Sequence, residues 1–348
     1  MKAYFKPYLL NFKTPSGTSR GILKQKKTYF LIIQDGEKTG IGECGLFEGL
    51  SYDDNPYYED KLYWVCQNIH LGLEKLLEHT TEFPSIQFGL EMAFLSLAAK
   101  DNFNLIPSQF TKGEDNIKIN GLIWMGEKAF MKSQIEEKIK QGFTCVKLKI
   151  GAINFDEELD LLRFIRNEFS AQDIELRVDA NGAFSKETAL KKLKQLSDYG
   201  LHSIEQPIKQ GQWETMAHLC KNTPLPIALD EELIGVVDVT KREELLQTIK
   251  PQYIILKPSL TGGITNSKHW MQIADKYSIG YWITSALESN IGLNAIAQFT
   301  YDLGLSMPQG LGTGGLFTNN FESPLEVIGE RLYYNQNKNW GNWEELLG

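Results

Sequence analysis

Short apolar runs alternate with amphipathic segments along most of the chain from Ile117 onward. Each β-branched or apolar run is followed by a segment with helical periodicity, then by a turn and another run, which is the pattern of parallel βα units. The expected strands end in polar residues that recur every 25 to 27 residues between Asp179 and Lys257. They lie near Ile117–Ile123, Val146–Ile150, Glu175–Asp179, Ser203–Glu205, Pro226–Asp230, Tyr253–Lys257, Tyr281–Ser285 and Leu305–Gln309.

Eight such units at a regular spacing predict an α/β fold of the (β/α)8 type, a modified TIM barrel, with an open parallel sheet as the alternative. The N-terminal region has a different pattern: a strand at Thr28–Ile33, a turn at Asp35-Gly36, and helices at Lys61–Leu77 and Phe88–Lys100. We expect an α+β capping domain there. The predicted division is residues 1–108 for the cap, 109–318 for the barrel and 319–348 for a C-terminal segment that packs back on the cap.

Composition narrows the classes of function. The 348 residues include 36 basic and 44 acidic side chains, and the net charge of −8 disfavours binding to nucleic acid or to an anionic membrane. No 18 apolar residues run together, and Met1–Phe12 is too polar for a signal peptide. The four cysteines form no CxxC pair, which indicates reduced thiols in a cytoplasm. We expect a cytoplasmic protein that acts on a small molecule, with a homo-oligomer left open.

Three acids end three successive strands: Asp179, Glu205 and Asp230. The C-terminal ends of barrel strands meet at one rim, so these carboxylates are expected to lie close together. Their repulsion calls for a cation, and an all-oxygen ligand set suits Mg²⁺, with Mn²⁺ as a substitute. The alternative is that each acid caps the helix that follows it.

Lysines occupy the neighbouring strand ends. Lys147 and Lys149 are two residues apart and leave the same face of a strand, and Lys257 ends a strand across the barrel. Like charges, including the metal and an inward Arg177, are expected to lower a lysine pKa toward neutrality and so to create a general base. Together with a metal-held carboxylate, such a base predicts removal of a proton next to a carboxylate.

Five motifs carry a family resemblance: KxK at Lys147–Lys149, DANGAF at Asp179–Phe184, EQP at Glu205–Pro207, DE at Asp230-Glu231 and KPS at Lys257–Ser259. With them the chain resembles the muconate-cycloisomerase subgroup of the enolase superfamily, whose metal-stabilised enediolate chemistry is well known. The SALES segment at Ser285–Ser289 is similar to the o-succinylbenzoate synthase family.

The resemblance implies a metal held by Asp179, Glu205 and Asp230, with Lys149 as the base and Lys257 stabilising the dianion from the opposite face. Lys147 completes the catalytic set, and Arg177, Asn181 and Glu231 support it. The implied reaction is the syn dehydration of 2-succinyl-6-hydroxy-2,4-cyclohexadiene-1-carboxylate to 2-succinylbenzoate, a step of menaquinone biosynthesis. Lys149 would return the abstracted proton to the departing hydroxyl group.

The substrate-binding residues are expected at Ser285, Glu288, Gly312, Thr313 and Arg20. The Gly310–Gly315 segment matches GxGxxG, but it follows the last strand and no further βα unit remains, which excludes a dinucleotide site. Its backbone N–H groups are candidates to bind the succinyl carboxylate. Two glycine-containing loops, Ser16–Gly21 and Gly42–Phe47, are candidates to close the site.

Two other functions stay open. A racemase of N-acylated amino acids or a dipeptide epimerase would use the same metal and both Lys149 and Lys257. Dipeptide epimerases generally carry an acidic motif after the eighth strand, whereas this chain has Leu311-Gly312-Thr313 there, which argues against a dipeptide substrate. The other alternative is a non-catalytic barrel that binds a carboxylate, and the destabilising cluster of acids and lysines argues against it.

Overall fold

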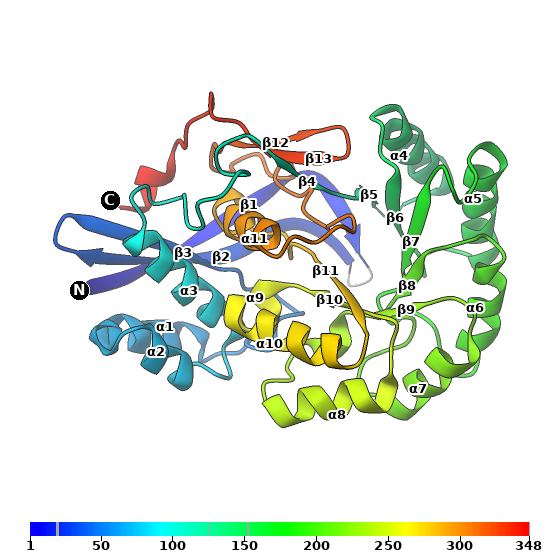
Figure 1. Ribbon diagram of the computed structural model, residues 1–348, viewed down its shortest axis with the longest axis horizontal. Coiled ribbons are helices and arrows are strands. Elements are labelled where there is room, and N and C mark those ends of the chain that lie inside the picture. The colour runs from blue at the N-terminus through cyan, green and yellow to red at the C-terminus, as the bar shows by residue number, and fades with distance from the viewer. Residues whose placement is uncertain (19–20, 125, 152, 348) are drawn as a thin grey trace.

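A curled sheet of seven parallel strands forms the centre of the molecule (Figure 1). The computed structural model describes residues 1–18, 21–124, 126–151 and 153–347. The strands are hydrogen-bonded in chain order. They are β5 (Gly121–Ile123), β6 (Cys145–Lys149), β7 (Glu175–Asp179), β8 (Ser203–Glu205), β9 (Ile227–Leu229), β10 (Tyr253–Leu256) and β11 (Gly280–Ile283).

Two residues close the sheet into a barrel. Gln309 pairs with Ile119 beside β5, and Gly310 pairs with Thr284 at the end of β11. The bonds from Asn120 N to Gln309 O and from Ser285 N to Gly310 O are both 3.0 Å long. A Cβ on Gly310 would lie 2.5 Å from Thr284 Oγ1, so only glycine fits this approach. The predicted barrel is confirmed, but its expected eighth strand at Leu305–Gln309 is reduced to this bridge.

Helices cover the outer face of the barrel, and Figure 1 shows α4 to α8 as an arc around the strands. Strand alternation explains the layering: in β6, Val146 and Leu148 join the hydrophobic core while Lys147 faces inward. The helices are α4 (Lys128–Lys140), α5 (Phe155–Glu168), α6 (Ala189–Ser197), α7 (Trp213–Asn222), α8 (Val239–Ile249), α9 (Pro258–Thr261), α10 (Gly263–Lys276) and α11 (Asn290–Asp302), with a short 3-10 helix η2 (Glu231–Leu233) after β9.

The first predicted barrel strand, Ile117–Ile123, is divided between two sheets. Its beginning is β4 (Asn116–Lys118), which pairs with β13 (Arg331–Tyr334) of the C-terminal hairpin, while its end is β5 in the barrel. The hairpin partner of β13 is β12 (Leu325–Ile328). One apolar run therefore contributes strands to two different sheets. Its hydrophobic pattern alone does not show where the chain passes from one sheet to the other.

The N-terminal domain is an antiparallel sheet packed on helices. Its strands are β1 (Lys2–Thr18), β2 (Gly21–Asp35) and β3 (Lys38–Cys44), and its helices are α1 (Tyr58–Gln67), η1 (Ile69–Leu71), α2 (Leu73–His79) and α3 (Pro84–Ala98). The expected helix at Lys61–Leu77 is broken at Gly72, whose φ of 80° lies outside the helical region. The sheet packs closely on α3, since a Cβ on Gly42 would lie 1.9 Å from the Gly89 carbonyl oxygen.

The C-terminal segment lies against β1. Phe12 forms a bridge to Phe317, and their ring centroids are 4.7 Å apart. The Asn319 side chain accepts a hydrogen bond from Asn11 N and donates one to Leu9 O, each 2.8 Å long. The last element, η3 (Trp343–Leu346), places the Leu346 carbonyl 3.4 Å from Tyr4 Oη. Among the described helices, none has the length and apolar character needed to span a membrane.

Candidate active site

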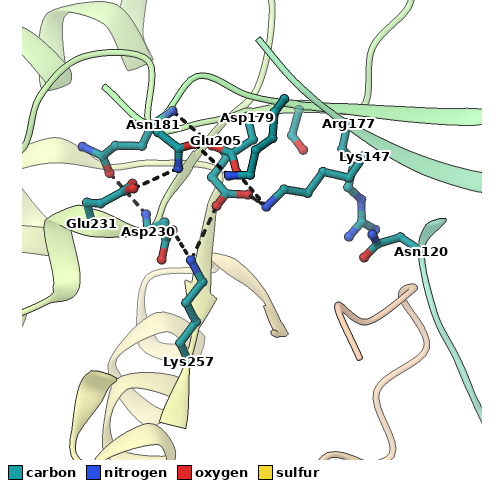
Figure 2. A network of polar contacts seen from close by, with 12 residues as sticks. Asn120, Lys147, Arg177, Asp179, Asn181, Glu205, Asp230, Glu231 and Lys257 are labelled. Atoms are coloured by element: carbon teal, nitrogen blue, oxygen red, sulfur yellow. Dashed lines mark hydrogen bonds and ion pairs between the residues drawn. The ribbon is translucent and has the colours of Figure 1, made fainter. Parts of the chain in front are cut away.

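Strand register brings the predicted acids together. Lys149 pairs with Asp179, Asp179 with Glu205, and Glu205 with Ala228, two residues before Asp230. The three acids are 0%, 2% and 2% exposed, respectively. Figure 2 shows them at the carboxyl ends of their strands, with lysine side chains reaching toward them.

Three lysines contact the three carboxylates. Lys147 Nζ lies 3.0 Å from Asp179 Oδ2 and also contacts Glu205. Lys149 Nζ lies 2.9 Å from the same Asp179 oxygen. Lys257 contacts Asp230 and lies 3.9 Å from Glu205 Oε1 (Figure 2). Each ammonium group therefore lies against at least one buried carboxylate, and the predicted inward orientation of the lysines is what the structure shows.

The electrostatics of the lysines differ from the sequence-based expectation. Burial alone would lower the pKa of Lys147, but the Asp179 and Glu205 carboxylates outweigh burial and raise it. The pKa of Lys257 is likewise raised, because Asp230 and Glu205 outweigh its burial. The carboxylates by themselves thus shift the pKa of these two lysines in the direction opposite to the expected fall, which included the charge of the metal.

The acids are affected in opposite directions. Burial would raise the pKa of Asp179, but Lys147 and Lys149 hold it well below its usual range. Burial and the Asp179 charge raise the pKa of Glu205 to about 8. The negative charge of Asp179 therefore disfavours ionisation of Glu205.

Arg177 does not act on the lysines as expected. Arg177 lies on β7 two residues before Asp179, in register with Lys147, and is 1% exposed. Its Nε donates to Glu175 Oε1 at 2.7 Å and its Nη1 donates to Pro308 O at 2.9 Å. The guanidinium also stacks over Trp282, 4.4 Å from the ring centroid. Carboxylates and burial dominate the pKa shifts of Lys147 and Lys257, so the expectation that Arg177 lowers a lysine pKa is corrected for these two residues.

The three carboxylates are candidate ligands of a divalent cation. Among the described residues, no three acid, histidine or cysteine side chains converge closely enough to hold a metal ion as they stand, because lysine ammonium groups lie between the carboxylates. Glu205 Oε1 is buried and has no hydrogen-bond partner within the described chain. A buried, unsatisfied carboxylate oxygen beside two further carboxylates is a donor set that suits a hard cation such as Mg²⁺.

Asn181 joins the base candidate to a neighbouring acid. It accepts a hydrogen bond from Lys149 Nζ at 2.7 Å. It donates one to Glu231 Oε1 at 2.9 Å (Figure 2). Its φ of 43° is left-handed, a conformation that asparagine tolerates better than most residues. The supporting positions predicted at Asn181 and Glu231 thus lie in direct contact with each other.

Gln206 was not among the predicted site residues. Its Oε1 accepts hydrogen bonds from the backbone N–H groups of Asp230 and Glu232, both at 3.2 Å, and its φ is 38°. The side chain therefore fixes the start of the segment that carries Asp230. The EQP motif contained this signal, because a buried glutamine after a strand needs partners for both ends of its amide.

A cavity of about 650 Å³ opens over the cluster. Lys147, Lys149, Asp179 and Lys257 line its polar end. Apolar side chains that line it elsewhere include Phe47 and Leu50 of the cap, with Leu122, Trp124 and Leu316. Phe47 belongs to a loop that the sequence singled out, whereas Leu50 and Trp124 were not predicted.

The predicted substrate-binding residues fall into three groups. Ser285, Gly312 and Thr313 line the cavity, and Thr313 Oγ1 lies 2.9 Å from Ser285 Oγ. Glu288 is fully buried behind the wall and accepts hydrogen bonds from Ser285 Oγ, Ser259 Oγ and Ala286 N. Glu288 was expected to contact the substrate. The structure corrects this expectation, because Glu288 does not line the cavity and instead holds Ser285 in place. Arg20 lies outside the described residues.

Comparisons with known proteins agree with this architecture. The family model described as enolase C-terminal domain-like matches residues 131–322. An o-succinylbenzoate synthase from Desulfotalea psychrophila is 47% identical over 93% of this chain and 96% of its own length. A D-Ala-D/L-Ala epimerase from Cytophaga hutchinsonii is 31% identical, over 83% of this chain and 80% of its own.

Structural similarity extends over the whole fold. The crystal structure of MenC from Desulfotalea psychrophila superposes with a TM-score of 0.86 and 43% identity, covering 96% of this chain and 99% of that one. The motifs at the strand ends and the cap-and-barrel architecture lead to the same assignment as the family model. The chain belongs to the enolase superfamily, in the family described as enolase C-terminal domain-like.

Proposed function

We propose that this chain is an o-succinylbenzoate synthase, a lyase that dehydrates 2-succinyl-6-hydroxy-2,4-cyclohexadiene-1-carboxylate to 2-succinylbenzoate in menaquinone biosynthesis. The observation that carries the proposal is the 47% identity to a synthase of that name along almost the whole chain. The geometry supports it, because two lysines from β6 and one after β10 reach the same group of buried carboxylates. We further propose that the protein acts in the cytoplasm.

Asp179, Glu205 and Asp230 would hold a Mg²⁺ ion, for which Mn²⁺ could substitute. When bound, such an ion neutralises the charge that develops on a substrate carboxylate as the adjacent carbon loses its proton. The unsatisfied Glu205 Oε1 supports this assignment. In the protein itself, Lys147 keeps Asp179 and Glu205 from repelling each other by lying between them.

Lys149 is the proposed acid and base. Its Nζ is held by Asp179 and Asn181, at 2.9 and 2.7 Å, at the edge of the cavity. It would take the proton from the carbon next to the carboxylate and give it to the departing hydroxyl group on the same face, which leaves as water. The ring becomes aromatic in this step, so the elimination is strongly favoured.

Lys257 would stabilise the dianion from the opposite side without moving a proton. Its Nζ contacts Asp230, and the Lys257 side chain is only 12% exposed. A fixed ammonium group in a dry site stabilises developing negative charge more effectively than water does. Ser285, Gly312 and Thr313 would bind the far carboxylate, and Phe47 and Leu50 would exclude water from the cavity.

Racemisation of N-acylated amino acids is the second candidate. The observation that favours it is the presence of both Lys149 and Lys257 in the cavity, since a racemase needs one proton carrier on each face. A dipeptide substrate is less favoured, because the residues after the last strand that line the cavity include no carboxylate to pair with an ammonium group; they are Gly310, Gly312, Thr313, Gly315 and Leu316.

The test is an absorbance assay on the purified full chain. With the cyclohexadiene substrate, we expect loss of its absorbance that requires Mg²⁺ and is abolished by a chelator. An unchanged spectrum in the presence of Mg²⁺ would contradict the proposal. Exchange of the α-proton of N-succinyl amino acids for deuterium, lost in both Lys149→Ala and Lys257→Ala, would instead support the racemase.

A further inference from the structure

A second cluster of buried charges joins the cap to the barrel, away from the metal-site carboxylates. Lys26 of β2 is 5% exposed, and Glu43 of β3 and Glu288 after β11 are fully buried. Charges are seldom buried so completely unless they are paired and hydrogen-bonded. The reaction described above uses none of the three, so their retention calls for another explanation.

Glu43 binds the N-terminus of α11. Its carboxylate accepts hydrogen bonds from Ser289 N at 3.0 Å, Ser289 Oγ at 2.5 Å and Gly292 N at 3.0 Å. From its own domain it accepts one from Thr28 Oγ1 at 3.0 Å. A Cβ on Gly292 would lie 2.7 Å from Glu43 Oε2, so glycine permits the approach. Glu43, a residue of the N-terminal domain, thus accepts hydrogen bonds from N–H groups at the start of a barrel helix that have no partner within the helix.

Lys26 binds the cavity wall itself. Its Nζ donates a hydrogen bond to Leu287 O at 3.0 Å and lies 5.7 Å from the centroid of the Phe47 ring. Leu287 has a φ of 63°, an unfavourable conformation for a residue of its size. Its N–H is held by Ser285 Oγ at 3.1 Å. The strained residue is therefore held at both its N–H and its carbonyl group.

Glu288 holds the same segment from its buried side. It accepts hydrogen bonds from Ser285 Oγ at 2.6 Å and Ala286 N at 2.8 Å. Ser285, Ala286 and Leu287, which we call the 285–287 wall, all line the cavity. Lys26 and Glu288 therefore bind this wall, while Glu43 binds the start of α11.

We propose that Lys26 is a positioning residue that sets the 285–287 wall, and through it the binding of the substrate's distal part. This inference rests on the proposed function for the identity of the substrate. Lys149, Asp179 and Lys257 stand on other strands and make none of these contacts. Loss of Lys26 should therefore weaken substrate binding far more than it slows the chemical step.

The experiment compares Lys26→Met with Lys27→Met in the Mg²⁺-loaded full chain. Lys27 is the next residue of β2, but its ammonium group forms an exposed ion pair with Glu59, 3.0 Å away, so it is a matched control. We expect Lys26→Met to raise KM about tenfold or more with kcat within about threefold of the parent. Lys27→Met should leave both constants unchanged. A mere loss of folded protein would lower kcat and leave KM unaltered, and that result would overturn the proposal.

The double variant Lys26→Met/Glu43→Gln separates positioning from charge balance. Removing Lys26 alone leaves two buried carboxylates without their cation, which destabilises the fold. The second change removes one of these charges, so the double variant should regain stability but keep the raised KM, because Leu287 O still lacks its donor. A KM restored to the parent value would overturn the proposal. If Lys26→Met does not fold, the double variant alone decides.

Hydrogen–deuterium exchange gives a result that does not depend on the reaction. We expect faster exchange in the peptide covering residues 285–292 of Lys26→Met and of the double variant than in Lys27→Met. Unchanged exchange there would overturn the positioning role. If the parent protein does not convert the cyclohexadiene substrate, the proposed function fails, while this comparison still tests the role of Lys26.

Discussion

Lys149 Nζ donates a hydrogen bond to Asn181 Oδ1 at 2.7 Å, and the backbone of Asn181 is left-handed with a φ of 43°. The amide of Asn181 is itself held by Glu231 at 2.9 Å. This chain of contacts limits the orientations open to the ammonium group at the cavity edge. If Lys149 is the base, as we propose, a side chain fixed in this way loses little freedom when the substrate binds.

Removal of the Asn181 side chain should therefore slow the reaction. Asn181→Gly keeps the left-handed backbone accessible but deletes the hydrogen bond to Lys149. We expect kcat to fall about tenfold or more with little change in KM, measured by steady-state absorbance assays. Asn342→Gly is the control, since Asn342 is also left-handed, with a φ of 64°, and belongs to the C-terminal segment. An unchanged kcat in Asn181→Gly would show that the contact is not used.

Asp230 should be needed for metal affinity. In Asp230→Asn we expect Mg²⁺ to bind at least about tenfold more weakly, because a carboxylate ligand is replaced by a neutral amide. Isothermal titration calorimetry with Mg²⁺ alone measures this without reference to turnover. The control is Asp238→Asn, because Asp238 is the exposed N-cap residue of α8. This variant should bind Mg²⁺ as the parent does. Equal affinity in Asp230→Asn would refute the ligand assignment.

Stability should depend on pH through Asp53 in the cap. Burial, partly offset by hydrogen bonds from Ser85, raises the pKa of Asp53 from 3.8 to about 6. Between these values the folded state binds more protons than the unfolded state, so the contribution of Asp53 to stability is present below pH 3.8 and is lost as the pH rises through about 6.

Asp53→Asn removes this titration. We expect the Tm of Asp53→Asn relative to the parent to increase as the pH rises from about 4 to 7, as measured by thermal unfolding at fixed ionic strength. Asp54→Asn, at the next and exposed position, leaves Asp53 titrating and should show a much smaller trend. A constant difference in Tm between Asp53→Asn and the parent across that range would be inconsistent with a buried, titrating Asp53.

Close packing between β3 and α3 predicts a strong effect at Gly42. A Cβ there would lie 1.9 Å from Gly89 O and 2.8 Å from Ala93 N, both backbone atoms that cannot move without displacing the helix. We expect Gly42→Ala to lower the free energy of unfolding by about 1–3 kcal/mol or more in urea titrations. Gly315→Ala, where a Cβ meets no atom within 4 Å, should unfold like the parent. Equal stability of the two variants would count against the packing described.

Much of the barrel and its rim could be predicted from the sequence. Strand alternation placed Lys147 on the inner face, and the spacing of strand ends brought Asp179 beside Glu205, as the register shows. Both inferences use only the period of a strand and the common direction of parallel strands. They depend on local pattern, which the sequence carries directly.

Other features depend on which distant segments meet, and the sequence carries no local signal for that. Gln309 and Gly310 close the barrel with a two-residue bridge, too short to show any periodicity. Arg177 was expected to act on the lysines, but its guanidinium donates to Pro308 O, 131 positions away along the chain. Lys26 contacts Leu287 across 261 positions of the chain, so its role emerges only in the folded protein.

The central claim is that Lys149 removes a proton next to a carboxylate held by the metal. The most direct measurement compares the parent with Lys149→Ala on the cyclohexadiene substrate at saturating Mg²⁺, after calorimetry has shown that both bind the ion. We expect a kcat lower by about 10²–10⁴-fold in Lys149→Ala with Mg²⁺ affinity retained. A variant that still turns over within about threefold of the parent would contradict it.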